Sequence, residues 1–259
     1  MVGVEKKHVV VIGGGTGSFV VLSGLRDYNL ELTAVVAMTD HGGSSGQLRD
    51  ELGVLPPGDV RQCLVALSRA SEQLRAIFTH RFGNGALKGH SLGNLFLAAC
   101  EELTGSFEEA VLVASRVLAI HGTVLPVTLE NSNVCMELGD GTMLKNECEI
   151  SQSSMLRSLG VSKIFLDPPA LANPRVIQAI RHADLVVIAP GNVYASLIPN
   201  LLVKGIAEAL CDTRAHIVYV CNLMTRRGHT DGFCVHNFAQ TLEYWARAQF
   251  IDTILFNSA

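Results

Sequence analysis

The sequence lacks long hydrophobic runs. No apolar stretch among its 259 residues approaches the about 18–20 residues that a transmembrane helix needs. The short apolar run after Lys6 and Lys7 is also too brief for the hydrophobic core of a secretory signal. We therefore expect a cytoplasmic protein with no membrane partner.

Charge and paired cysteines are also scarce. Charged residues make up 17% of the chain and the formal net charge is -4, so a broad electrostatic grip on nucleic acid is not expected. The seven cysteines are an odd number, widely spaced and without a C-x-x-C pair. Neither a zinc site nor a disulfide framework follows from that spacing.

Hydrophobic residues, by contrast, make up 48% of the chain, as in sheets that are buried on both faces. The first buried strand is predicted at 8–12 (HVVVI), and five residues, four of them glycine, follow it. A helix is then predicted from Ser18 to about Arg26, and a second strand at 32–38. This order is typical of a right-handed βαβ unit.

The middle of the chain is less regular. Residues 41–58 are predicted to be a long, polar, glycine-rich loop, after which Asp59 opens a helix with Gln62 placed for a capping box. Residues 124–151 are predicted to form strands, with Asp140-Gly141 as a tight hairpin turn.

Strands and helices alternate again in the C-terminal part. Strands are predicted at 163–166, 184–189, 216–221 and 251–256, and helices from Pro174, at about 195–210 and at 236–248. Asn173 should cap the helix that begins at Pro174. The expected fold is α/β, one doubly wound domain over 1–259 with a mainly parallel sheet and a mid-chain β-hairpin excursion at about 124–151.

Four loops are suited to bind an anion at the carboxyl edge of such a sheet, because glycine lets the backbone approach an oxyanion closely. They span 13–18, 40–46, 90–94 and 190–196. Together they predict a nucleotide diphosphate as ligand. The candidate binding residues are Gly13, Gly14, Gly15, Thr16, Gly17, Gly42, Gly43, Ser44, Ser45, His90, Asn94, Gly191, Asn192 and Ser196.

The first loop matches neither common nucleotide motif. No Gly-Lys-Ser/Thr follows it, and in the dinucleotide fingerprint Gly13 and Gly15 fit but Ser18 takes the third glycine position. Asp40 lies 25 residues past Gly15 and leads directly into a second glycine-serine loop, which would crowd a ribose. The sequence therefore disfavours an ordinary NAD-dependent dehydrogenase.

Asp40 and Asp59 are the carboxylates best placed to hold a divalent cation beside a diphosphate. Mg²⁺ typically uses one or two carboxylates together with phosphate oxygens. Two alternatives remain open: Asp59 as a helix cap and Asp40 in a loop hydrogen bond. Arg49, Arg61 and Arg81 follow the loops and could pair with phosphate or brace the loops.

Several longer motifs resemble the gluconeogenesis factor family, which is related to 2-phospho-L-lactate transferase. They are VVVIGGGTGS, TDHGGSSGQLRDELGVLPPGD, GHSLGNL, APGNVYASLIPNLL and NLMTRRGHTDGF, in this order over essentially the whole chain. The resemblance implies a Rossmann-like fold. It also implies binding of UDP-sugars such as UDP-N-acetylglucosamine, a role in carbon metabolism and cell shape, and self-association.

In the related transferases, the aspartates that match Asp40 and Asp59 hold the metal, and the loop that matches 189–196 lies at the phosphate-bearing ligand. Two departures stand out. The factor branch usually has Tyr where this chain has Phe233 and Asp-His where it has Val235-His236. Family members also continue past the strand that ends here at Asn257, so a C-terminal segment is expected to be absent.

Three functions follow from these residues. The first is a nucleotide-sugar-binding regulator without catalysis. The second is a metal-dependent transferase that moves a phospho-lactyl-type group from a nucleoside diphosphate to an alcohol, with Asp40 and Asp59 as its catalytic residues. The third, an NAD(P)-binding oxidoreductase, rests only on the first βαβ unit.

Overall fold

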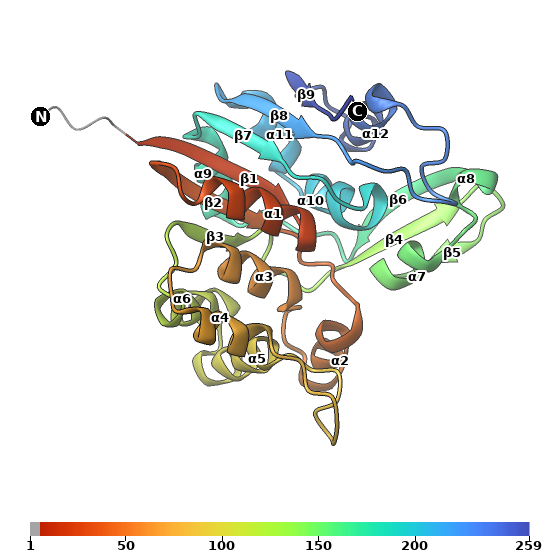
Figure 1. The fold of residues 1–259 in the computed structure, drawn as a ribbon. Helices are drawn as coiled ribbons and strands as arrows, with labels where there is room; N and C mark the ends of the chain where they lie inside the picture. The colour runs from red at the N-terminus through yellow and green to blue at the C-terminus, as the bar shows by residue number, and fades with distance from the viewer. Residues whose placement is uncertain (1–5, 259) are drawn as a thin grey trace, which may run out of the picture.

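A six-stranded parallel sheet forms the centre of the computed structural model, which describes residues 6–258 (Figure 1). Its strand order is β3-β2-β1-β7-β8-β9, and every neighbouring pair is parallel. The order reverses between β1 and β7. The strands are β1 (Lys7–Gly13), β2 (Leu30–Val36), β3 (Thr123–Pro126), β7 (Leu185–Ile188), β8 (His216–Val220) and β9 (Thr253–Leu255).

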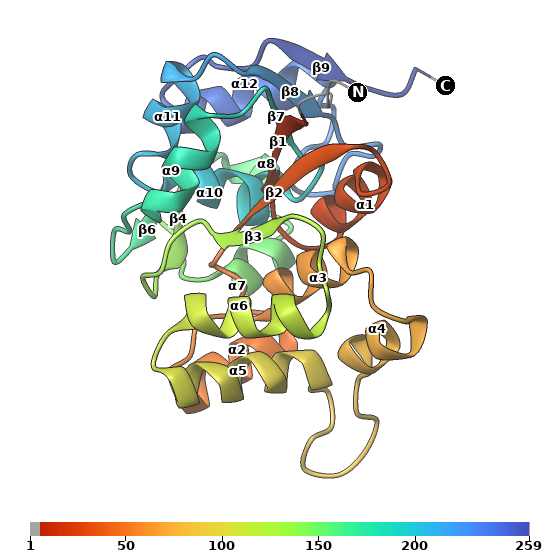
Figure 2. The same ribbon diagram turned by 90° about the vertical axis from the view of Figure 1, so that its left-hand side faces the viewer.

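The sheet forms because its central strands are apolar on both faces. Val9, Val10, Val11 and Ile12 of β1 are all buried, and β1 pairs with β2 from Lys7 opposite Leu30 to Gly13 opposite Val36. Such strands need helices on both sides. Figure 2 shows α1 (Gly15–Leu25) on one face and α9 (Pro174–Arg181) and α11 (Ile206–Asp212) on the other. The predicted doubly wound α/β fold is confirmed.

A group of helices extends beyond the β3 edge of the sheet (Figures 1 and 2). The serine at the N-terminus of three of these helices, α4, α5 and α6, accepts a hydrogen bond from a first-turn backbone N–H, as an N-cap does. The elements of this region are α2 (Gly43–Leu52), α3 (Gly58–Leu67), α4 (Glu72–Thr79), α5 (Leu92–Thr104) and α6 (Phe107–Val117).

A second, antiparallel sheet has the order β5-β4-β6 and contains β4 (Asn133–Leu138), β5 (Met143–Leu144) and β6 (Val161–Asp167). The predicted Asp140-Gly141 turn joins β4 to β5, with Gly141 at a positive φ of 87°. Three assignments change. β3 lies in the main sheet, β6 pairs with β4 instead of joining the main sheet, and residues 147–152 form helix α7 (Glu147–Gln152).

These differences have local causes. Only alternate residues of β6 are buried along Lys163–Leu166, which suits a sheet with one solvated face rather than the buried parallel sheet. The side chain of Asn146 accepts a hydrogen bond from the N–H of Glu149 and so caps α7. A cap of this kind favours a helix over the strand expected from the sequence.

The predicted 41–58 loop and 195–210 helix are also wrong. Helix α2 lies inside that loop and ends at Gly53, which adopts a left-handed conformation with φ 72°. The 195–210 segment is broken into the π-helical turn η1 (Val193–Leu197), α10 (Ile198–Leu202) and α11, with Gly205 at φ 103° before α11. The remaining helices are α8 (Leu156–Leu159) and α12 (Val235–Ala246).

Within residues 6–258, no helix combines the length and the apolar character that crossing a membrane would require.

The packing of α3 on the sheet can be tested with Leu64→Ala. The Leu64 side chain is 0% exposed, so its removal leaves a cavity and should lower the free energy of unfolding by about 2–5 kcal/mol. Leu103→Ala is the matched control because Leu103 is 87% exposed, and it should change the value by less than about 0.5 kcal/mol. Urea unfolding of both variants measures the difference, and equal values would contradict this packing.

Candidate functional site

A cavity of about 280 Å³ opens at the carboxyl ends of β1, β2 and β7, beside the point where the strand order reverses. Ligands of open α/β sheets commonly bind at such a point. Three of the four predicted loops meet here. The lining residues are Gly14, Gly15, Thr16, Gly17, Ala37, Thr39, Asp40, Asp59, Gln62, Glu147, Pro190, Gly191, Asn192, Ala195 and Ser196.

The glycines of the first loop let it lie directly on two other segments. A Cβ atom on Gly14 or Gly15 would stand 2.7 Å or 2.9 Å from a carboxylate oxygen of Asp59. A Cβ atom on Gly17 would overlap the carbonyl oxygen of Pro190. The loop after β1 therefore needs glycine in order to pack against α3 and against the loop after β7.

Asp59 does not cap α3, contrary to the expected capping box with Gln62. The helix begins at Gly58, and no side chain caps its N-terminus. The Asp59 carboxylate instead accepts a hydrogen bond from the backbone N–H of Gly15. It therefore faces the cavity and joins α3 to the first glycine loop.

Asp40 both lines the cavity and makes a loop hydrogen bond, the two alternatives that the sequence left open. Its Oδ1 accepts a hydrogen bond from the N–H of Gly42 at 2.9 Å, and its side chain also lines the cavity. A Cβ atom on Gly58 would overlap Oδ2 of Asp40, so this oxygen lies against the start of α3, next to Asp59 in the chain. The structure thus brings the two predicted carboxylates to one wall.

The cavity is electrostatically unusual because Asp40, Asp59 and Glu147 line it without any basic side chain. Burial, together with the negative charges of Asp40 and Glu147, raises the pKa of Asp59 to about 7. Burial also raises the pKa of Glu147, against a hydrogen bond from Ser151 that lowers it. A cation in the cavity would relieve this repulsion.

A site made wholly of protein ligands is not present in the described chain, where no three His, Cys, Asp or Glu side chains are grouped to hold a metal ion. Asp40 and Asp59 could supply the one or two carboxylates that Mg²⁺ uses when phosphate oxygens and water complete its octahedron.

The fourth predicted loop does not line this cavity. His90 and Asn94 are buried, and each lies 3.1 Å from Oγ of Ser44, with Arg61 donating from Nε to Oδ1 of Asn94. This network joins α2, α3 and α5. Gly13, Gly42, Gly43 and Ser45 likewise lie outside the lining. Ligand contacts by these residues stay a prediction.

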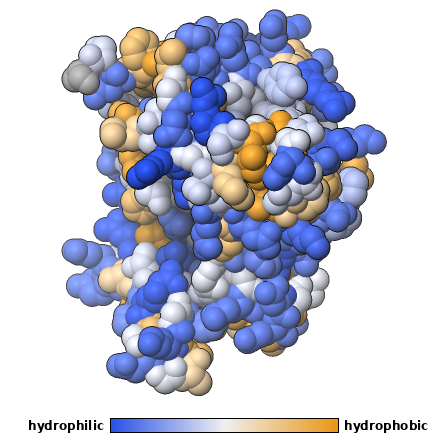
Figure 3. Space-filling view, turned by 90° about the vertical axis from the view of Figure 1, so that its right-hand side faces the viewer, coloured by the Kyte–Doolittle hydropathy of each residue, from blue (hydrophilic) through white to orange (hydrophobic). Residues whose placement is uncertain are grey.

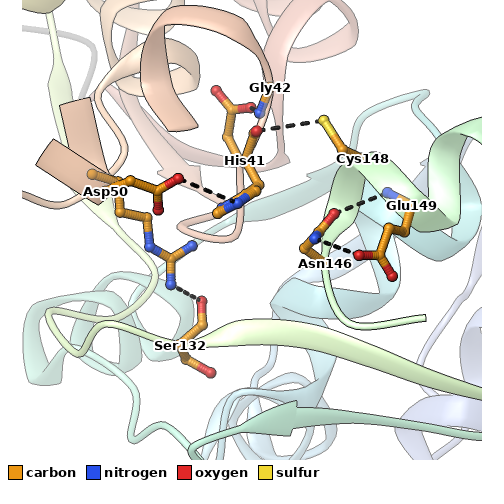
Figure 4. A network of polar contacts seen from close by, with 9 residues as sticks. His41, Gly42, Asp50, Ser132, Asn146, Cys148 and Glu149 are labelled. Carbon is orange, nitrogen blue, oxygen red and sulfur yellow. Dashed lines mark hydrogen bonds and ion pairs between the residues drawn. The ribbon is translucent and has the colours of Figure 1, made fainter. Parts of the chain in front are cut away.

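The three arginines considered for phosphate binding lie outside the cavity lining and bond other groups, Arg81 the carbonyl oxygen of Gly89. Arg49 donates from Nη2 to the carbonyl oxygen of Ser132 at 3.0 Å, and Arg61 bonds Asn94 at 2.9 Å (the Arg49–Ser132 contact is drawn in Figure 4). Both side chains are buried. These arginines therefore brace the loops, which was the alternative to phosphate binding.

Comparison with known proteins agrees with this architecture. A family model described as 2-phospho-L-lactate transferase CofD matches residues 9–259. The gluconeogenesis factor of Halalkalibacterium halodurans is 44% identical over 253 residues, which cover 97% of this chain and 77% of that protein. The gluconeogenesis factor of Bacillus subtilis is 41% identical over 98% of this chain and 80% of its own length.

The chain belongs to the gluconeogenesis factor family.

A solved structure supports the same assignment. The crystal structure of a UPF0052-family protein from Bacillus halodurans has a TM-score of 0.94 and 42% identity, and the match covers 99% of this chain and 82% of that one. Other relatives are longer. A Nostoc protein that is 45% identical over 249 residues is matched over 54% of its length, so this chain spans about half of that relative.

In this member of the gluconeogenesis factor family, Glu147 is the charged cavity residue that sequence reasoning missed, and Ala37, Thr39 and Gln62 are uncharged ones. Residue 147 had been placed in a strand, whereas α7 turns its side chain toward the cavity. Ser151 donates to Oε1 of Glu147 at 2.7 Å, and Asn192 donates to Oγ of Ser151 at 3.1 Å. The Asn-Glu-x-Glu pattern of 146–149, a cap followed by acidic residues, was the available signal for a helix.

The same helix is tied to the second glycine loop (Figure 4). Sγ of Cys148 donates to the carbonyl oxygen of His41 at 3.4 Å, and Asn146 caps the helix through Glu149. Helix α7 thus contributes Glu147 to one wall of the cavity.

The raised pKa of Asp59 predicts a pH dependence of stability. In the unfolded chain an aspartate ionises near about 3.9, whereas Asp59 in the folded protein holds its proton up to about 7. Between these values the folded state binds more protons than the unfolded state, so stability should fall as pH rises. Asp59→Asn has no such proton. As pH rises through this window, the free energy of unfolding of Asp59→Asn minus that of wild type should therefore increase.

Urea unfolding at several pH values between about 4 and 8, with EDTA present, measures this change in the free energy of unfolding. Asp27→Asn is the control, because the Asp27 side chain is 80% exposed. A difference between Asp59→Asn and wild type that stays constant with pH would contradict the assignment.

Proposed function

We propose that this protein binds a nucleotide-sugar, such as UDP-N-acetylglucosamine, through its diphosphate and Mg²⁺ in the glycine-loop cavity. We further propose that it acts without catalysis, as a regulator in carbon metabolism and cell morphogenesis. The observation that carries the proposal is the cavity itself, where glycine loops after β1 and β7 meet Asp40 and Asp59.

The phosphates have backbone donors in this cavity. Helix α1 begins at Gly15, and the N–H groups of its first turn have no helical partner. The N–H of Gly15 bonds the Asp59 carboxylate, which leaves those of Thr16 and Gly17 for a ligand. Those N–H groups and the positive end of the helix dipole favour an anion.

The carboxylates explain why a cation is part of the proposal. Asp40, Asp59 and Glu147 would repel a diphosphate in a cavity that no basic side chain lines. Mg²⁺ when bound would neutralise this charge and share oxygens with the phosphates. Asp40 and Asp59 would hold the ion, and their proximity to the N-terminus of α1 would place it beside the phosphate-binding N–H groups.

The regulatory part of the proposal rests on the relatives. The matched proteins of Halalkalibacterium halodurans and Bacillus subtilis are named gluconeogenesis factors rather than enzymes. Self-association, which the family resemblance implied, stays a prediction.

Isothermal titration calorimetry with UDP-N-acetylglucosamine, UDP-glucose and UDP tests the proposal. Binding is expected with Mg²⁺ and should weaken when EDTA removes the ion. Asp40→Asn should weaken binding with Mg²⁺ present by at least about tenfold, because it removes a charged ligand of the metal. The fold should persist, since Asn can still accept the hydrogen bond from Gly42.

Asp27→Asn serves as the control and should bind like wild type, because the Asp27 side chain is exposed. No heat with any of the three ligands at millimolar concentration would exclude the nucleotide-sugar proposal. Equal affinity of Asp40→Asn and wild type would exclude the metal role of Asp40.

A second candidate function is a metal-dependent transferase, favoured by the match of residues 9–259 to the 2-phospho-L-lactate transferase model. The substrate alcohol oxygen would form a bond to the phosphorus that carries the lactyl group, and the bond from that phosphorus to the bridging oxygen would break. The nucleoside monophosphate would leave, and the alcohol proton would pass to a base. Turnover of a nucleoside-diphospho-lactate with a deazaflavin alcohol decides for this candidate, and its absence alongside UDP-sugar binding decides against it.

A further inference from the structure

A second cavity, of about 410 Å³, lies between α8, η1, α12 and the loop that precedes α12. Its walls include Arg157, Tyr194, His229, Phe233, Gln240 and Trp245. Figure 3 views the side of the molecule on which α8 lies and shows apolar surface within a mainly hydrophilic face. The cavity is lined by His229 and Phe233 of the NLMTRRGHTDGF motif, and no residue of this motif lines the glycine-loop cavity.

The two cavities lie on either side of one helical turn. Tyr194 of η1 lines the second cavity, while Ala195 and Ser196 line the glycine-loop cavity. A helix with its side chains is about 10 Å thick, so the cavities are close neighbours. The two linings share no residue, so one elongated ligand that places groups in both cavities must pass around η1.

Aromatic rings and an available cation form one part of the second cavity. The Arg157 guanidinium lies 5.9 Å from the centre of the Phe233 ring. It also acts on the Tyr194 hydroxyl, whose pKa burial raises and Arg157 lowers. Among the described residues, Arg157 has no carboxylate partner, so its donors can bind ligand oxygens.

His229 contributes a buried acceptor to the same wall. Its ring is 2% exposed, and Nε2 lies 2.7 Å from the carbonyl oxygen of Ser153. A carbonyl can only accept, so Nε2 carries the proton, and burial lowers the pKa of the ring and favours its neutral form. Nδ1 therefore has a lone pair, and no donor reaches it within the part of the chain that the structure describes.

We propose that the second cavity is the binding site for the base of the nucleoside diphosphate whose phosphates occupy the glycine-loop cavity. A flat heterocycle can stack on the rings of Phe233 and Trp245, as bases commonly do on aromatic side chains. The Gln240 amide and the Arg157 guanidinium can bond the oxygens and N–H groups at its edge. This inference rests on the proposed function and assigns the part of the ligand that the first cavity does not hold.

The chain carries its own reporter for this site, because Trp245 is the one tryptophan in the sequence. Tryptophan fluorescence is followed while UDP or inorganic pyrophosphate is added with Mg²⁺, and calorimetry records binding of both. UDP should change the fluorescence of Trp245. Pyrophosphate, which lacks a base, should bind without changing it.

Arg157→Gln and Gln240→Ala supply the variant test. Arg157→Gln should weaken UDP binding by about tenfold, as expected for the loss of a charged hydrogen bond, and leave pyrophosphate binding unchanged. Gln240→Ala should act in the same direction. Arg181→Gln and Gln249→Ala are matched controls, because both residues lie outside the two cavities. These controls should bind both ligands like wild type.

The outcomes separate the two proposals. If UDP and pyrophosphate bind but the variants bind UDP normally and Trp245 does not respond, the base lies elsewhere and the diphosphate proposal stands. If neither ligand binds, the proposed function and this inference both fail. A pyrophosphate affinity that falls as much as the UDP affinity in Arg157→Gln would also overturn the assignment of a base site.

Discussion

The contact between the first glycine loop and Asp59 determines the rest of the site. Gly14 and Gly15 lie so close to the Asp59 carboxylate that a single Cβ atom would push them apart, and the Gly15 N–H bonds this carboxylate. The contact brings the end of β1 and the start of α3 together around one cavity. It also buries a carboxylate where an anionic ligand is proposed to bind, which makes a cation part of any account of binding.

The accumulation of acidic groups without a basic partner distinguishes this cavity from common phosphate sites. In P-loop proteins a lysine accompanies the glycine loop. Here the charged residues that line the cavity are Asp40, Asp59 and Glu147, while Arg49 and Arg61 are held by Ser132 and Asn94. Arg49 thus joins α2 to the segment before β4, and Arg61 joins α3 to α5. Attraction for phosphate must then come from backbone N–H groups and from a bound ion.

Much of the parallel sheet was predictable because each buried strand is a short apolar run bounded by turn residues. The HVVVI strand and the Asn173 cap of α9 lie where the sequence placed them, whereas α1 begins at Gly15, three residues before its predicted start at Ser18. Helix α2 was missed because Gly43, Ser44, Ser45 and Gly46 are poor helix formers, and tertiary contacts such as Arg49 to Ser132 support it instead. Helix α7 was missed because its six residues follow a strand pattern.

The sequence by itself determined the α/β class, the family and the loops with Asp40 and Asp59, because these depend on local patterns of apolar and glycine residues. Only the tertiary structure decided which of these residues share a cavity. It brought Glu147 to the site on helix α7, which follows β5 of the small sheet, and placed His90 and Asn94 in a buried network away from the cavity lining. Which residues meet in the cavity depends on how helices and sheets that are distant in sequence pack together, and local sequence patterns carry no such information.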